Sequence, residues 1–114
     1  MMIIEDENKV SSQKIHLHCR SDNVSPIEEV PTTMTYLPAA AVYNNTMFIT
    51  GIGENINEIW KYNFSSGWRR CGSLVQGRLC HCTEFIDETL YICGGNDKTY
   101  NSVINHIEAY NAVT

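Results

Sequence analysis

The stretch YNNTMFITGIG, residues 43–53, is repeated in outline by IDETLYICGGN, residues 86–96. Each copy has a polar turn, then an apolar run that contains an aromatic residue, then glycine, and equivalent positions lie 43 residues apart. A fixed period of a few tens of residues is typical of proteins in which one supersecondary unit recurs. The sequence therefore predicts a repeat architecture.

The recurrence extends past the glycines. The stretch IWKYN, residues 59–63, corresponds to IEAYN, residues 107–111, at an offset of 48. The five additional residues fall in the polar stretch NDKTYNSVIN, residues 96–105. A surface loop accepts an insertion of this length at a small entropic cost. The two copies are therefore expected to differ in one loop and to agree in their strands.

The repeated unit is predicted to be an antiparallel sheet of short strands. A first strand of mixed character, 39–43 or 81–86, precedes a tight polar turn and the apolar strand that ends in glycine. A strand carrying a tyrosine follows, and the first copy adds a strand that opens with Trp68. Short runs of this kind, separated by turn residues, are typical of β-strands. Because no stretch of about 12 residues has apolar residues at helical spacing, the sequence predicts an all-β chain.

Composition restricts the classes of function. The chain has 114 residues, of which 43% are hydrophobic and 18% charged, so one globular unit is predicted. Its formal charge of −5 disfavours nucleic acid as a partner, since nucleic-acid domains cluster lysine and arginine on one face. No apolar run approaches the roughly 20 residues that span a bilayer, and the acidic start MMIIEDENK does not resemble a signal peptide. We therefore expect no membrane association and a cytoplasmic location.

Two further features bear on the cellular compartment. Glycosylation acceptor patterns begin at Asn23, Asn44 and Asn63, but they would matter only in a secreted chain. The cysteines are odd in number and do not form a dense framework, so they are predicted to stay reduced. They are Cys19, Cys71, Cys80, Cys82 and Cys93. An extracellular module with oxidised cysteines is the alternative, and unmodified asparagines in secreted material would exclude it.

The repeated positions resemble a known family. The marks are glycines after an apolar strand, a tyrosine further on, a tryptophan six positions later, and an arginine and a histidine that open the next unit. In these marks the sequence is similar to the kelch repeat. The positions that carry the structural signature are Gly51, Gly53, Tyr62, Trp68, His81, Gly94, Gly95 and Tyr110, with Arg78 as the arginine.

The resemblance implies consecutive four-stranded antiparallel blades of an incomplete kelch β-propeller. On this basis residues 38–80 form a complete repeat and residues 81–114 a partial one, while residues 1–37 are interpreted as a degenerate partial blade. The strands expected in that first blade are 1–4, 15–18 and 27–30. Because closed propellers need about four to eight blades, we expect a fragment, a truncated isoform or a partial gene model of a longer protein. A β-sandwich of two similar hairpins is the alternative fold.

The motifs that usually announce catalysis are missing from the sequence. Cys80, His81 and Cys82 suggest zinc, but adjacent strand residues point to opposite faces and cannot converge on one ion. His16 and His18 would share a strand face, yet they lack two further ligands in register. The sequence has no nucleophile elbow, P-loop or dinucleotide fingerprint. We therefore predict no metal site, no cofactor and no enzyme activity.

A protein-binding role is predicted instead. The connecting loops of a propeller vary on a rigid scaffold, which suits recognition of a protein partner or a substrate peptide. The relevant loops are 52–57, 73–79 and 96–102. Because arginine and tyrosine are favoured as contact anchors, the candidate partner-binding residues are Arg78, Asp97, Lys98 and Tyr100. For Arg78 a structural pairing with a neighbouring blade is the alternative, and the sequence leaves both interpretations open.

The spacing of residues 68–81 indicates which group of kelch proteins the sequence most resembles. W-x-x-C-x-x-L followed by G-R-x-x-H, residues 68–81, is most similar to the kelch-like proteins, in which BTB and BACK domains precede the propeller. This resemblance implies a substrate-recognition adaptor of a cullin-type E3 ubiquitin ligase. Binding of the ligase machinery would then belong to BTB and BACK domains, which these 114 residues do not contain. Binding of actin filaments and a nonfunctional truncated product are the alternatives.

Overall fold

The computed structural model describes residues 2–4, 15–20, 23–99 and 101–113, with side chains from residue 25 onward. These residues form strands in three antiparallel sheets and include no helix that could cross a membrane. The strands are β1 (Met2–Ile4), β2 (Ile15–Arg20), β3 (Asn23–Pro26), β4 (Ala39–Tyr43), β5 (Thr46–Ile52), β6 (Glu58–Asn63), β7 (Gly67–Ser73), β8 (Cys82–Ile86), β9 (Thr89–Cys93) and β10 (Ile107–Asn111).

The central sheet is a four-stranded meander with the order β4-β5-β6-β7. Its first hairpin turns at Asn44 and Asn45, whose φ angles are 52° and 60°. Asparagine enters this left-handed region more readily than most residues. Two successive residues with positive φ produce the turn whose twist matches that of paired strands. The polar turn in the sequence therefore directly specifies this hairpin.

The aromatic signature residues lie next to one another in the central sheet. Tyr62 on β6 and Trp68 on β7 are directly paired in the ladder, and their ring centroids are 5.0 Å apart. Tyr62 is buried and Trp68 is half-buried. The Trp68 indole nitrogen donates a hydrogen bond of 2.7 Å to the carbonyl oxygen of Glu28. The aromatic pair thus fastens the outer strands to the segment that precedes the sheet.

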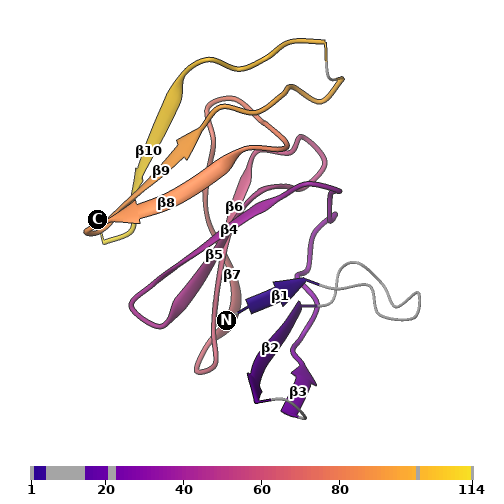
Figure 1. Ribbon diagram of the computed structural model, residues 1–114, viewed down its shortest axis with the longest axis vertical. Coiled ribbons are helices and arrows are strands. Elements are labelled where there is room, and N and C mark those ends of the chain that lie inside the picture. The colour runs from indigo at the N-terminus through magenta and orange to yellow at the C-terminus, as the bar shows by residue number, and fades with distance from the viewer. Residues whose placement is uncertain (1, 5–14, 21–22, 100, 114) are drawn as a thin grey trace.

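The sheet formed by β8, β9 and β10, called the second sheet below, has strands equivalent to the first three strands of the central sheet. It has the order β10-β9-β8, and in Figure 1 the three sheets follow one another across the molecule in chain order. Gly51 and Gly94 occur at equivalent points of the two sheets and have φ angles of 82° and 69°. The predicted all-β fold of consecutive antiparallel blades in a partial propeller is confirmed. The predicted blade boundaries at residues 37 and 80 stay a prediction.

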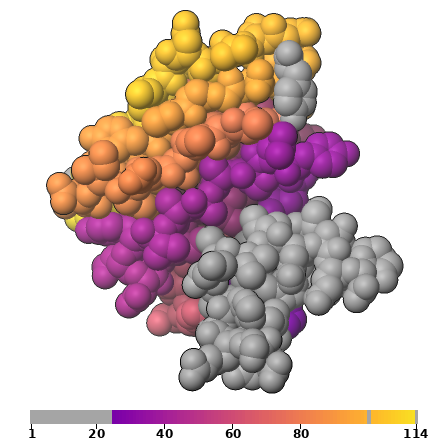
Figure 2. All heavy atoms as spheres, viewed as in Figure 1, coloured from indigo at the N-terminus to yellow at the C-terminus, as the bar shows by residue number. Residues whose placement is uncertain are grey.

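An apolar core joins the central sheet to the second sheet. Phe48 and Ile59 of the central sheet pack with Leu90 and Ile92 of β9, both of which are fully buried. Phe48 also meets Phe85 of β8 edge to face, with ring centroids 5.2 Å apart. Figure 2 shows the second sheet lying directly against the central sheet on the visible face. Burial of this apolar area is the main force that holds the two blades together.

The opposite face of the central sheet is covered by the segment before it. Val30 is buried there among Met47, Ile49 and Tyr62, and Ile27 packs at the edge of the same cluster. A strand was predicted over residues 27–30, but β3 ends at Pro26. Proline has no N–H to donate to a ladder, so it commonly ends a strand. The expected strand was wrong, because the apolar residues of this segment serve the core between blades.

Candidate functional site

Three loops gather at one end of the sheets. Consecutive antiparallel strands run in opposite directions, so every second connection returns to the same end. These connections are residues 53–57 between β5 and β6, residues 74–81 between β7 and β8, and residues 94–106 between β9 and β10. Residues 31–38 enter β4 from this end as well. We call the exposed surface of these four segments the loop face.

Backbone hydrogen bonds hold the segments of the loop face together. The amide of Arg78 donates to the carbonyl oxygen of Ile56 at 3.1 Å. Leu79 and Asn96 exchange two bonds of 2.9 Å, and Cys80 donates to Leu37 at 3.0 Å. Each connection is therefore fixed by another connection as well as by its own strands. Contacts of this kind restrain the described residues of the loops, and restraint of a binding surface reduces the entropy lost on binding.

Arg78 is the centre of this arrangement. Its side chain has 0% exposure and donates to the carbonyl oxygens of Gly94 and His106, each at 3.0 Å. Its guanidinium also forms an ion pair of 2.7 Å with the carboxylate of Glu108 on β10. A buried charge is tolerated when it is paired and its donors are satisfied. Arg78 therefore ties the loop after β7 to both ends of the loop between β9 and β10.

Glu108 joins β10 to the loop that follows β7. Its carboxylate accepts hydrogen bonds from the backbone amides of Val75 and Gln76 at 2.6 and 3.0 Å. Burial would raise the pKa of Glu108, but these amides and the charge of Arg78 outweigh it and hold the pKa below its usual value. The carboxylate is therefore ionised at neutral pH, as the ion pair requires.

His81 lies buried where the two sheets meet. Its Nε2 atom is 2.7 Å from the hydroxyl of Thr50 on β5, while its Nδ1 atom has no hydrogen-bond partner in the part of the chain that the structure describes. Burial, together with the nearby charge of Arg78, lowers the pKa of His81 from 6.5 to about 4. His81 is therefore neutral at physiological pH and acts as part of the interface between blades.

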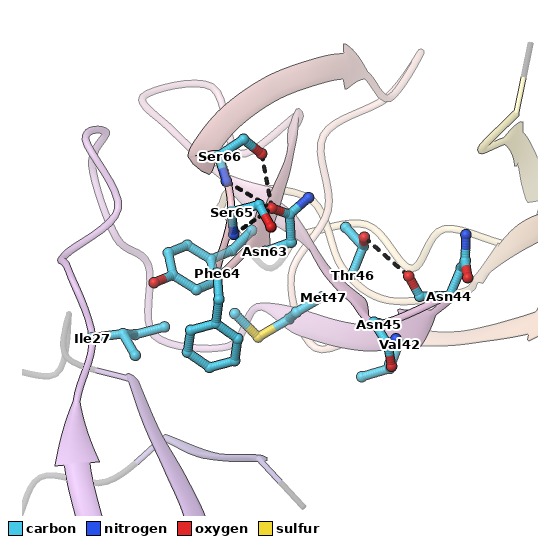
Figure 3. Close-up of a pocket in the computed structure, with 11 residues that line it drawn as sticks. Ile27, Val42, Asn44, Asn45, Thr46, Met47, Asn63, Phe64, Ser65 and Ser66 are labelled. Carbon is cyan, nitrogen blue, oxygen red and sulfur yellow. Dashed lines mark hydrogen bonds between the residues drawn. The ribbon is translucent and has the colours of Figure 1, made fainter.

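A separate pocket lies at the opposite end of the central sheet. It has a volume of about 670 Å3, and Figure 3 shows Met47 and Phe64 in its lining with Ile27 at one side. The Oδ1 atom of Asn63 accepts hydrogen bonds from the backbone amides of Ser65 and Ser66 at 3.0 and 2.8 Å. The polar rim thus serves the local turn, and no group of three metal-ligating side chains occurs among the described residues.

Comparison with known proteins agrees with this architecture. A family model described as Kelch motif matches residues 77–114. The solved structure of YjhT is similar over 72% of this chain, with 26% sequence identity and a TM-score of 0.57. Residues 77–114 therefore match a kelch motif, and the fold of the chain is similar to that of YjhT. It spans 26% of the length of the YjhT chain, and none of the curated protein sequences matches it.

Two residues of the predicted kelch signature, Gly51 and Tyr110, lie at the junction of the two sheets. Gly51 lies so close to the next blade that an added Cβ would be 2.5 Å from the His81 ring. Tyr110 on β10 donates from its hydroxyl to the carbonyl oxygen of Cys71 at 3.2 Å, across the junction of the sheets. Kelch repeats generally mediate protein binding, so the exposed loops are the part of the chain to consider for contact with a partner.

The structure gives the four candidate binding residues different surroundings. Arg78 is buried and engaged inside the chain, which is the arrangement expected from the structural alternative. Lys98 is exposed and donates to the carbonyl oxygen of Glu54 at 2.7 Å. Asp97 is engaged within its own loop, where it accepts from the amides of Thr99 and Asn101 at 3.1 Å. Tyr100 lies outside the described residues.

Sequence reasoning missed two kinds of residue at this end. Glu108, the partner of Arg78, was not singled out from the sequence, where it lies in the strand that carries Tyr110. The exposed apolar side chains of the loop face were also missed, and they include Tyr36 and Val75 at 93% and Val103 at 77% exposure. The sequence pattern that could have identified these side chains is an apolar residue within an otherwise polar loop. Other exposed apolar side chains, such as Val42, Phe64 and Ile86, lie away from the loop face, so exposure alone does not single out this end.

The buried neutral state of His81 predicts a pH dependence of stability. Its pKa is lower in the folded chain than in the unfolded chain, so the unfolded chain binds more protons between pH 6.5 and about 4. The neutral His81 ring therefore contributes fully to the free energy of unfolding above pH 6.5, and this contribution is lost as the pH falls from 6.5 towards 4. We expect a loss on the order of 2 kcal/mol, allowing for solvent screening.

The measurement is urea denaturation at several pH values between 7 and 5, compared with His81→Gln. An amide can still bond to Thr50 but does not titrate, so the variant should lose less stability over this range. The lowered pKa values of Glu58 and Glu108 act below 4.5 and therefore affect both chains only at lower pH. Equal slopes for the two chains would show that His81 does not cause the dependence.

Proposed function

We propose that this chain is a protein-binding module and that the loop face is its recognition surface. The observation that carries the proposal is the network of contacts that braces the loops at this end of the sheets, whose exposed side chains include apolar ones. Arg78 and Glu108 hold the loops from inside, while Tyr36, Val75 and Val103 project to solvent. Anchors of this kind, on loops restrained by such contacts, favour binding of a protein surface or peptide.

The polar groups of the loop face support binding more than catalysis. The ionisable groups enclosed or shifted by neighbours at this end include Arg78, Glu108, His81 and Glu58, and each contacts another part of the chain. Asp97 is held by its own loop. A catalytic group needs access to substrate, whereas these groups are occupied with keeping the loops in place. The proposed function is therefore a binding function.

The narrower proposal is a substrate-recognition adaptor of a cullin-type E3 ubiquitin ligase. It is supported by the spacing of residues 68–81, which resembles the kelch-like proteins. In such an adaptor the loop face would bind the substrate, and BTB and BACK domains would bind the ligase machinery. Binding of actin filaments is the second candidate supported by the same resemblance, and co-sedimentation with purified filaments tests it directly.

The loop face is tested by exchanging exposed residues at the two ends of the sheets. Val75→Gln and Lys98→Glu change the loop face, while Val113→Gln changes a valine with 60% exposure beside the Glu88 turn at the other end. We expect each loop-face change to weaken capture of a partner by about tenfold, as for an interface anchor. Val113→Gln should leave capture unchanged.

The readout is quantitative capture of proteins from cell extract by the 114-residue chain, with circular dichroism to confirm that each variant keeps its β signal. Equal capture by all four chains would place recognition elsewhere. Loss of capture by Val113→Gln alone would move the recognition surface to the opposite end of the sheets. A captured partner that includes a substrate and its ubiquitylated forms would favour the adaptor, and captured actin would favour the alternative.

A further inference from the structure

Two cysteines face each other across the second sheet. Cys82 is the first residue of β8 and Cys93 the last residue of β9, and the two are directly paired in the antiparallel ladder. Side chains of directly opposed residues point to the same face of a sheet. Cys82 is exposed and Cys93 is half-buried, and both are free thiols. The hairpin thus places two thiols side by side within reach of solvent.

The backbone geometry of this pair suits a disulfide. Directly opposed residues in an antiparallel ladder have Cα atoms about 4.5 to 5.5 Å apart. Disulfides bridge Cα separations of roughly 4.4 to 6.8 Å. The pair also lies at the open end of the hairpin, between the loop that enters β8 and Gly94. The separation that the ladder sets for such a pair lies within the range of a disulfide, so the bond needs little movement of the strands.

The equivalent pair in the central sheet shows that packing does not require the thiols. Ala39 and Thr50 are directly paired at the same place in the β4–β5 hairpin. Thr50 uses its hydroxyl to contact His81 of the following sheet. The position therefore accepts alanine and a small polar residue in one blade. Two cysteines in the other blade add a chemical capacity that the fold does not need.

We propose that Cys82 and Cys93 form a reversible dithiol–disulfide pair. The oxidant is a low-molecular-weight disulfide such as oxidised glutathione. The Cys82 thiolate attacks one sulfur of this disulfide, forming a mixed disulfide and releasing one small thiolate. The Cys93 thiolate then attacks the sulfur of Cys82, which forms the internal bond and releases the second small thiolate. The protein loses two protons and two electrons, and one small disulfide becomes two thiols.

The chemistry of such a bond suits regulation more than structural support. Exposed or strained disulfides have higher reduction potentials than buried structural ones and are the labile class. Oxidation would add a covalent link between β8 and β9 beside the hydrogen bonds that already join Leu79 to Asn96. Reduction by excess glutathione would release it. This property does not depend on the identity of any binding partner.

The test is oxidation of the native 114-residue chain with oxidised glutathione, followed by alkylation of the remaining thiols. Before alkylation, intact mass should fall by the mass of two hydrogen atoms, and reduced glutathione should restore it; after alkylation, the oxidised chain should carry two alkyl groups fewer than the reduced chain. Proteolysis after Glu84 or Glu88 separates Cys82 from Cys93, so the expected product is a pair of peptides joined by a disulfide. Addition of glutathione at separate cysteines without an internal bond would overturn the proposal.

Variants assign the bond to its residues. Cys82→Ser and Cys93→Ser should each abolish the internal bond and leave a stable mixed disulfide with glutathione. Cys71→Ser should keep the bond, because Cys71 lies on β7. Cys80→Ser should also keep it, which matters because Cys80 is exposed and lies two residues before Cys82. An internal bond that survives Cys82→Ser but not Cys80→Ser would overturn the assignment.

A comparison under denaturing conditions keeps the test independent of variant folding. In guanidinium the ladder no longer holds the two thiols opposite one another, so the wild-type chain should form a mixture of links among its cysteines. The native wild-type chain should form the Cys82–Cys93 link in preference to the others. The same mixture under both conditions would show that the fold does not direct the bond.

Discussion

Replacing Arg78 with alanine is expected to lower the free energy of unfolding by about 3 to 5 kcal/mol, the range for breaking a buried ion pair from one side. The substitution removes the 2.7 Å contact with Glu108 and leaves the carbonyl oxygens of Gly94 and His106 without this donor. It also opens a cavity where a fully buried side chain stood. The expected result is a chain that melts early or fails to fold.

The matched control is Arg70→Ala. Arg70 is also an arginine in a pair with a glutamate, but its side chain is 49% exposed and lies 3.9 Å from the carboxylate of Glu58. Exposed pairs of this kind contribute roughly 0 to 1 kcal/mol, so the control should lose little stability. Urea denaturation followed by circular dichroism measures both. Similar losses for the two variants would contradict a central role for Arg78.

Replacing Gly51 with alanine is expected to cost about 3 kcal/mol or more, since a strained backbone and a steric overlap act together. Gly51 has a φ angle of 82°, which disfavours any residue with a Cβ atom. The added Cβ would also lie 2.5 Å from the ring of His81 and 2.7 Å from the carbonyl oxygen of Arg78. Both groups are buried and held, so they cannot move away cheaply.

Gly94→Ala is the control for this prediction. Gly94 has a similar φ angle of 69°, but the nearest atom to an added Cβ would be the carbonyl oxygen of Ile104 at 3.9 Å. Only the backbone preference acts there, so a loss of about 1 to 2 kcal/mol is expected. Thermal and urea denaturation of both variants measure the difference. If Gly94→Ala proved as damaging as Gly51→Ala, contact with the next blade would not be the cause.

The sequence was sufficient for the strands and their order because those features depend on near neighbours. The polar turns at residues 44–45 and 87–88 and the apolar runs after them specify hairpins within a dozen residues. The spacing of Tyr62 and Trp68 around a short turn likewise places the two rings on adjacent strands. The first blade was predicted less well, since its residues 27–30 carry apolar side chains for the core and do not form a strand.

The sequence indicated which loops lie together at one end of the sheets but not how their side chains are arranged. The three loops named from the sequence do lie at one end, because antiparallel alternation requires it. The role of each side chain depended on contacts distant in sequence. Lys98 reaches the backbone of Glu54, and Asp97 turns back on its own loop. Lys98, Asp97 and Arg78 are all charged residues that commonly occur in surface loops, so residue type alone could not show that Arg78 is buried while Lys98 is exposed.

The sequence by itself determined the repeat, the hairpins and the glycines with left-handed backbone, since each is encoded by residues close together along the chain. The register of the β8–β9 hairpin, and with it the pairing of Cys82 with Cys93, belongs to the same class. The tertiary structure alone decided that Arg78 meets Glu108 thirty residues away and that Gly51 is confined while Gly94 is open. Those outcomes depend on one sheet packing against another, and a packing contact between distant segments has no local sequence pattern to announce it.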